Sequence, residues 1–131
     1  MIELMEWIDE KGLKKAAVTN APRDNAEMML KSIGRLEWFD CLIIGDECER
    51  AKPDPLPYQL AMEKLGLEPS GSMVIEDSPS GARAGVAAGA LTVGILTSQP
   101  AEALTAQGCK LLIHDYFDEQ LWTALDKDLK R

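Results

Sequence analysis

Residues 73–81 read MVIEDSPSG, and in this stretch two adjacent carboxylates stand between an apolar strand and the start of a helix. Ser78 followed by Pro79 is typical of a helix N-cap with proline at the first helical position. Glu76 and Asp77 are therefore predicted to lie at the carboxyl end of a strand. Neighbouring carboxylates repel each other unless a positive group lies beside them, and oxygen ligands of this kind suit magnesium bound next to a phosphate. An acidic helix N-terminus that suits the helix dipole is the alternative, and it accounts for one of the two.

The composition is that of one globular domain with an acidic balance. The chain has 131 residues, 46% of them hydrophobic, which is enough to bury a single core. Its net charge of -8 argues against a nucleic-acid partner, because binding to a phosphate backbone requires clustered Lys and Arg. The three cysteines, Cys41, Cys48 and Cys109, form no CxxC pair, which argues against a zinc site or a disulfide framework.

The expected location is cytoplasmic, without a membrane partner. The cysteine pattern favours a reducing compartment. No run approaches the ~18 apolar residues that a membrane span requires. The acidic start MIELMEWIDE is not typical of a secretory signal or a transit peptide, although organelle targeting stays open if a further N-terminal segment exists.

Hydrophobic periodicity predicts helices and short apolar strands in alternation along the whole chain. The apolar face of the second helix is predicted to consist of Ala26, Met29, Leu30 and Ile33. The predicted helices cover residues 2–11, 22–33, 54–65, 79–88 and 118–129, and the predicted strands cover residues 16–18, 42–44, 73–75, 91–95 and 111–113.

Short strands without polar alternation, separated by amphipathic helices, indicate a parallel sheet covered on both faces, which is a doubly wound α/β domain. Ligands of such sheets bind beyond the carboxyl ends of the strands. The residues that follow the predicted strands are Thr19 and Asn20, Gly45 and Asp46 on the way to Lys52, and Glu76 and Asp77.

These residues favour a phosphate site. The hydroxyl of Thr19 and the backbone N–H of Asn20 can donate hydrogen bonds to a phosphate oxygen, and Lys52 can supply a positive charge to the same group. The segment after Lys52 contains three prolines, which restrict where the ammonium can reach. Two alternatives remain: residues 19 and 20 form an ordinary turn, and Lys52 is a solvated surface charge.

The order of these elements resembles a known family. The segments VTN at 18–20, AKPDP at 51–55 and IEDSPSG at 75–81 resemble motifs two, three and four of haloacid dehalogenase-like (HAD) hydrolases. The stretch AGVAAGALTVGILT, residues 84–97, is similar to the helix and strand that follow motif four in the sugar-phosphate phosphatase and phosphoglucomutase branch. The resemblance covers nearly all of the chain.

The resemblance implies a magnesium-dependent phosphatase of small phosphorylated metabolites, with sugar phosphates as the expected substrates. It gives Thr19 the role of a hydrogen-bond donor to the phosphate, with Asn20 beside it. Lys52 would neutralise the transferring phosphoryl group and orient the nucleophile. Asp77 would be a direct Mg2+ ligand, and Glu76 would bind the ion or one of its waters.

The chain departs from the family in one respect. These enzymes carry an aspartate nucleophile and an aspartate acid/base, in a DxD pattern, at the end of a first strand that is central in the sheet. Here the sequence begins with the helix before motif two, so residues 1–131 are expected to be a partial core domain without that strand and without the substrate-selecting cap. We therefore expect a part of a longer enzyme. The alternative is a non-catalytic domain that binds phosphate or a partner, with its open sheet paired to a strand from another chain.

Overall fold

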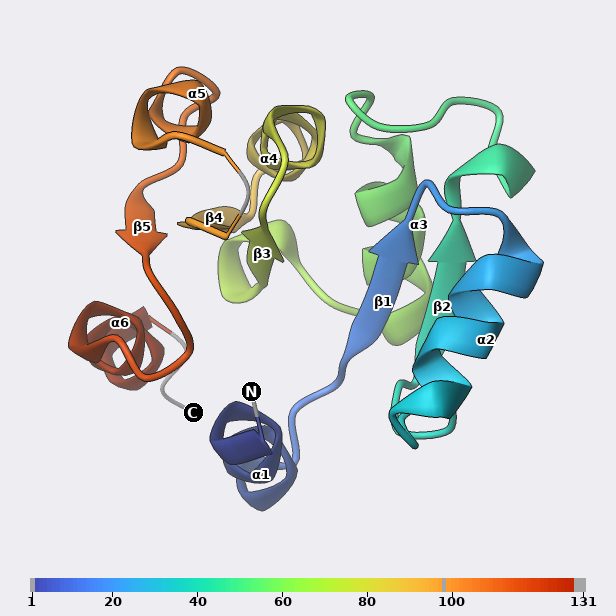
Figure 1. The fold of residues 1–131 in the computed structure, drawn as a ribbon, viewed down its shortest axis with the longest axis horizontal. Coiled ribbons are helices and arrows are strands. Elements are labelled where there is room, and N and C mark those ends of the chain that lie inside the picture. The colour runs from blue at the N-terminus through green and yellow to red at the C-terminus, as the bar shows by residue number, and fades with distance from the viewer. Residues whose placement is uncertain (1, 98, 129–131) are drawn as a thin grey trace.

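Helices and parallel strands alternate along the chain in the computed structural model, which describes residues 2–97 and 99–128 (Figure 1). All five predicted strands and all five predicted helices are present, and residue 129 of the last predicted helix lies outside the described residues. A short helix, α5, and two 3-10 helices, η1 and η2, were not predicted. The elements are α1 Ile2–Lys11, β1 Ala16–Thr19, α2 Arg23–Ser32, β2 Cys41–Ile44, η1 Gly45–Glu47, α3 Leu56–Leu65, η2 Pro69–Gly71, β3 Met73–Glu76, α4 Pro79–Ala87, β4 Leu91–Ile95, α5 Ala101–Thr105, β5 Leu111–Ile113 and α6 Glu119–Asp128.

Local sequence signals set the ends of the two helices nearest the predicted site. The Ser78 side chain accepts a hydrogen bond from the N–H of Gly81, so it caps α4 as the sequence predicts. At the C-terminal end of α3, Gly66 adopts φ 67°, a left-handed conformation that suits glycine and ends the helix. Both signals fix where the neighbouring strands end, and thereby where the residues after them lie.

The strands form two separate parallel sheets. One contains β1 and β2, and the other contains β3, β4 and β5 in that order. Figure 1 shows β1 and β2 side by side, with β3 set apart from β1. The predicted fold is therefore confirmed as a doubly wound α/β architecture, and β1 and β3 are not hydrogen-bonded neighbours in it.

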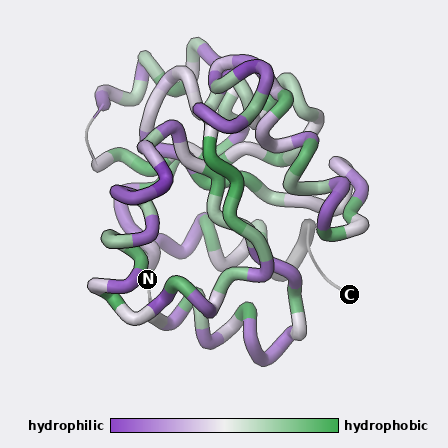
Figure 2. The backbone as a smooth tube through the Cα atoms, turned by 90° about the vertical axis from the view of Figure 1, so that its right-hand side faces the viewer, coloured by the Kyte–Doolittle hydropathy of each residue, from purple (hydrophilic) through white to green (hydrophobic). Residues whose placement is uncertain are grey.

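Helices cover both faces of the second sheet and also bridge the two sheets. On one face, α1 and α6 pack against it through a cluster that contains Leu4, Val93, Ile95, Ile113, Leu121 and Leu125. On the other face, α3 and α4 share a cluster that contains Tyr58, Met62, Val74, Ala84, Ala88 and Ala90, with Val18 of β1 packed against it. Since α3 contacts β1, β2 and α4, it joins the two sheets on this face. Figure 2 shows the apolar strands inside and the more polar helices around them.

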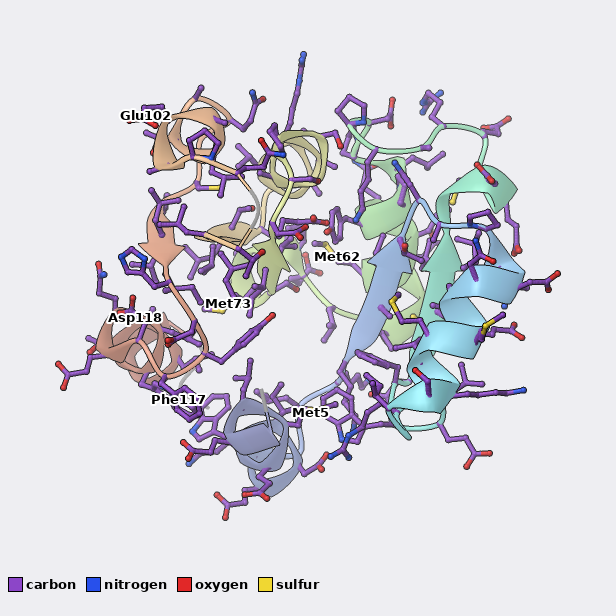
Figure 3. The ribbon with its side chains drawn as sticks, viewed as in Figure 1. Met5, Met62, Met73, Glu102, Phe117 and Asp118 are labelled. Carbon is purple, nitrogen blue, oxygen red and sulfur yellow. The ribbon has the colours of Figure 1, made fainter. Side chains whose placement is uncertain are left out.

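A cavity of about 820 Å³ separates the two sheets. Its lining includes Met5 of α1, Met62 of α3 and Met73 of β3, which are labelled in Figure 3. It also includes Val18 of β1 and Ile75 of β3, so the facing strands of both sheets form its walls. The space between the sheets is therefore largely apolar along its length.

Hydrogen bonds at the ends of β1 and β3 show which backbone groups face this cavity. The carbonyl of Lys15 accepts from the N–H of Asp40, toward β2, and the carbonyl of Ser72 accepts from Leu91 of β4. Successive residues of a strand direct their backbone groups to opposite edges. The residues whose N–H and C=O groups face the cavity are therefore Ala16 and Val18 in β1 and Met73 and Ile75 in β3.

One expectation about burial is wrong. An apolar strand at residues 16–18 is expected to be buried, but β1 is only half-buried at every position, because it borders the cavity. On the predicted apolar face of α2, Ala26 is buried, whereas Met29 is 55% and Ile33 is 60% exposed. Within residues 2–97 and 99–128, no helix has the length and apolar content that crossing a membrane requires.

Candidate phosphate and metal site

The five residues predicted for the site gather at one end of the cavity. Thr19 ends β1 and Asn20 follows it, Lys52 lies in the segment between β2 and α3, and Glu76 ends β3 with Asp77 after it. All five line the cavity. Because the strands are parallel, their carboxyl ends meet at the same edge, which is where doubly wound sheets bind ligands.

Lys52 connects the two sheets at this end of the cavity. Its ammonium donates a hydrogen bond of 2.8 Å to the carbonyl oxygen of Val18, one of the β1 groups that face the cavity. It also donates to Oε2 of Glu76, which belongs to the other sheet. The two side chains are only 8% and 9% exposed, so the alternative of a solvated surface lysine is wrong.

Glu76 is held on three sides. Lys52 and the hydroxyl of Tyr58 both donate to its Oε2. On the third side, a Cβ atom at Gly81 of α4 would collide with the Glu76 carboxylate, so this close approach requires glycine. A buried carboxylate needs hydrogen-bonded or charged partners, and these contacts supply them.

Tyr58 is the residue of this cluster that the sequence did not reveal. It lies near the start of α3 with 7% exposure, and the Lys52 ammonium is 5.1 Å from the centre of its ring. Burial, together with the negative charge and the hydrogen bond of Glu76, raises the pKa of Tyr58 above its ordinary value of 10.0, so the phenol stays protonated and donates. Its apolar helical position gives no sign of this contact in the sequence.

Thr19 and Asn20 form the β1 side of the site. The hydroxyl oxygen of Thr19 accepts a hydrogen bond of 3.0 Å from the N–H of Ala21, which leaves the hydroxyl hydrogen available for an anion. The side chain of Asn20 lies against Gly45, where a Cβ atom would collide with the Asn20 amide oxygen. Its Nδ2 donates to the carbonyl of Lys52 at 3.5 Å, so the loops after β1 and β2 touch.

An ion pair further along these loops also links them. Arg23 at the start of α2 donates to both carboxylate oxygens of Glu47 in η1, at 2.6 and 2.8 Å. The Arg23 hydrogen bonds hold the pKa of the Glu47 carboxyl below its ordinary value. Such a two-point contact fixes orientation as well as distance, so it limits relative movement of the two loops beside the site. Asp46, next to Glu47, is exposed and keeps no assigned role.

Asp77 is the exposed carboxylate of the predicted metal pair. Its negative charge helps to raise the pKa values of Tyr58 and Tyr116, so it lies near both rings. No group of three or more His, Cys, Asp or Glu side chains suited to a metal ion occurs among the described residues. The donor set still fits magnesium in type, because this ion is commonly held by one or two carboxylates together with water and substrate phosphate.

Comparisons of the chain with known proteins match it to one family. Residues 1–95 match the family described as haloacid dehalogenase-like hydrolase. Validoxylamine A 7'-phosphate phosphatase of Streptomyces hygroscopicus subsp. limoneus is 41% identical over 103 residues, which are 79% of this chain and 48% of that protein. Phosphorylated carbohydrates phosphatase of Thermotoga maritima is 36% identical over 87 residues, 66% of this chain and 40% of that protein.

A solved structure extends the similarity to the fold. A HAD family hydrolase from Deinococcus radiodurans R1, with bound phosphate and sodium, superimposes with a TM-score of 0.85 at 28% identity. The match covers 96% of this chain and 57% of that one. The chain therefore spans about half the length of the curated relatives that it matches.

Proposed function

The chain belongs to the haloacid dehalogenase-like hydrolase family, and from this premise we propose that it forms the phosphate- and metal-binding half of a phosphatase. The expected substrates are small phosphorylated metabolites, with sugar phosphates first among them. The observation that carries the proposal is the meeting of Thr19, Lys52 and Asp77 at the carboxyl end of two parallel sheets, beside one cavity. The names of the two phosphatase relatives support the substrate class.

The proposed residues make different contacts with a phosphate group. Thr19 donates its hydroxyl hydrogen, and the backbone N–H of Asn20 can donate beside it. The Lys52 ammonium offers positive charge to the phosphoryl oxygens, in a partly dry site where charge acts more strongly than in water. Lys52 must share its hydrogen bonds between Glu76, Val18 and the phosphate, and three donors allow this.

Magnesium is the metal expected at this site. Asp77 would hold it directly, and Glu76 would bind the ion or one of its waters, as the family resemblance implies. When bound, the ion would neutralise charge on the phosphate oxygens. Glu76 already has two donors in this structure, so Asp77 carries the larger share of the proposed metal binding.

The nucleophile is proposed to come from a polypeptide segment outside these residues. The only carboxylates among the residues that line the cavity within the described part of the chain are Glu76 and Asp77. A strand placed between β1 and β3 would end beside Lys52, and a carboxylate there would meet the ammonium. This strand would come from the remainder of a longer protein or from another chain.

The open sheet edges also favour a second function. The backbone N–H and C=O groups of four residues point into the largely apolar cavity, as they would in a sheet that accepts an added strand. These residues are Ala16, Val18, Met73 and Ile75. In this alternative the domain binds phosphate or a partner without catalysis. Both functions need the phosphate site, but only the first needs a nucleophile on the added strand.

Calorimetry with inorganic phosphate, with and without Mg2+, tests the proposed site on residues 1–131. Replacing Lys52 by Met is expected to weaken phosphate binding roughly tenfold or more, since it removes a charged donor. Asp77→Asn is expected to abolish the dependence on Mg2+. Lys110→Met removes an exposed lysine elsewhere and is the matched control.

The Lys52→Met variant needs a companion double variant, because on its own it leaves the Glu76 carboxylate buried without a positively charged partner. Breaking one side of a buried ion pair costs about 3–5 kcal/mol. The double variant Lys52→Met with Glu76→Gln removes both charges and keeps the fold testable by circular dichroism. Phosphate binding by a folded Lys52 variant at the wild-type affinity would refute the proposed site.

A further inference from the structure

We propose that Tyr58 is a positioning residue that holds Glu76 and the Lys52 ammonium in the arrangement needed to bind a phosphate. The inference rests on the proposed function and adds to it a residue that touches neither phosphate nor metal. Its phenol oxygen donates to the same Glu76 oxygen that accepts from Lys52. Its ring lies beneath the ammonium, 5.1 Å from the nitrogen.

The ring and the hydroxyl have separable effects. The ring gives the ammonium a favourable surface through a cation–π contact. The hydroxyl gives the Glu76 carboxylate a second donor, so the carboxylate does not depend on Lys52 alone. Lysine has a long flexible side chain, and several fixed contacts are needed to hold its charge in one place.

Glu76 cannot turn away from this pair of donors without meeting α4. Gly81 lies against the carboxylate so closely that there is no room for a Cβ atom. The carboxylate is therefore confined between α4 on one side and the Tyr58 and Lys52 donors on the other. The side chain of Asp77, the next residue, is exposed and keeps its oxygens for a metal.

Loss of the hydroxyl should draw Lys52 toward Glu76 and away from the phosphate. With one donor removed, the buried carboxylate has Lys52 as its remaining charged partner, and the pair tightens because the surroundings are poor in water. The ammonium is then less available to a third group.

Phosphate affinity of four variants tests the proposal. Tyr58→Phe keeps the ring and is expected to raise the Kd for inorganic phosphate roughly five- to tenfold, about the net effect of one ordinary hydrogen bond. In the Lys52→Met/Glu76→Gln background the same change is expected to have no further effect, because the groups through which Tyr58 acts are gone. Thr92→Val removes a buried hydroxyl that donates to the carbonyl of Ala90 and does not line the cavity, and it should leave the affinity unchanged. Equal weakening by Tyr58→Phe in both backgrounds would mean a general structural role and would overturn the proposal.

A second measurement separates this proposal from the proposed function. In a ¹H–¹⁵N spectrum of the lysine ammonium groups, Lys52 is expected to give a slowly exchanging signal that shifts in Tyr58→Phe and disappears in Tyr58→Leu. If wild-type protein binds no phosphate but shows this behaviour, the phosphate site fails while the positioning role stands. If the Lys52 signal is the same in wild type, Tyr58→Phe and Tyr58→Leu, the positioning role is refuted whatever the phosphate result.

Discussion

Glu76 and Asp77 are neighbours in the sequence and have opposite surroundings in the structure. The Glu76 side chain is 9% exposed and accepts from Lys52 and Tyr58, whereas Asp77 is exposed at the cavity. Glu76 is the last residue of β3 and lies against α4, whereas Asp77 follows the end of the strand. The pair is therefore better described as one buried, hydrogen-bonded carboxylate and one exposed carboxylate than as two equal groups.

Gly81 can be tested as the residue that makes room for Glu76. Gly81→Ala should gain about 1 kcal/mol from helix propensity but lose more, about 1–3 kcal/mol, from forcing the carboxylate off its donors. We expect a net loss in the free energy of unfolding, measured by urea denaturation, and weaker phosphate binding. Arg83→Lys, at an exposed position of α4 that does not line the cavity, is the control and should change neither quantity. A Gly81→Ala variant as stable as the wild type would contradict the close contact.

The pH dependence of stability follows from Tyr58. Its pKa is raised in the folded state above the ordinary value of 10.0, so the stabilisation is complete below pH 10.0 and is lost as the pH rises further. Above that pH the unfolded phenol ionises while the folded one keeps its proton, and the free energy of unfolding falls by at most about 1.4 kcal/mol per pH unit. Subtracting the urea curves of Tyr58→Phe isolates this effect from other groups that titrate there. The free energy of unfolding of the wild type minus that of Tyr58→Phe is expected to fall between about pH 10 and pH 11, and a constant difference would show that Tyr58 is not buried as described.

At the scale of elements, the two sheets depend on helices that pack across both. Although α1 leads directly into β1, its residues pack with β4, β5 and α6, which belong to the other sheet. On the opposite face α3 contacts β1 and β2 and packs against α4. These two helices hold the halves in place although no hydrogen-bonded ladder joins β1 to β3.

Amide exchange should reveal the open edges residue by residue. The N–H groups of Ala16, Val18, Met73 and Ile75 face the cavity and are expected to exchange roughly a hundredfold faster than their neighbours. The neighbours, Ala17, Thr19, Val74 and Glu76, donate within their own sheets and serve as internal controls. NMR detection of exchange in heavy water resolves the alternation. Equal protection on both sets would mean that β1 and β3 are paired by another segment.

The order of elements could be read from the sequence, but their packing could not. Apolar runs and caps such as Ser78 and Gly66 are local signals, and they located every strand to within one residue at each end. The five-residue α5 lacks an extended apolar pattern, and it was missed. The exposure of Met29 and Ile33 on α2 also escaped prediction, because periodicity shows that a face is apolar but not whether another element covers it.

The same distinction holds for the site. Residue types and their positions after strands identified Thr19, Asn20, Lys52, Glu76 and Asp77, and the structure brings all five to one cavity. The contacts of Tyr58 and Gly81 with Glu76 depend on how α3 and α4 approach β3. Such tertiary distances leave no local pattern, so the sequence alone assigns no role to Gly81 or Tyr58.

For the whole molecule, the cavity between the two sheets is the main feature. The cavity of about 820 Å³ is open to solvent over part of its boundary, so water fills it unless protein does. The apolar lining and the four backbone edges favour an added strand over water, which supports the proposal that a further segment completes both the sheet and the active site.

The most direct test of the account is a residue-resolved map of where phosphate binds. We would titrate ¹⁵N-labelled residues 1–131 with inorganic phosphate in the presence of Mg2+ and follow the backbone amide signals. The account predicts that Thr19, Asn20, residue 52 and Asp77 shift together with one common affinity, and that the same shifts need roughly tenfold more phosphate or higher in the Lys52→Met/Glu76→Gln variant. Saturable shifts confined to another part of the chain, or an unchanged affinity in that variant, would contradict a phosphate site at the carboxyl ends of β1 and β3.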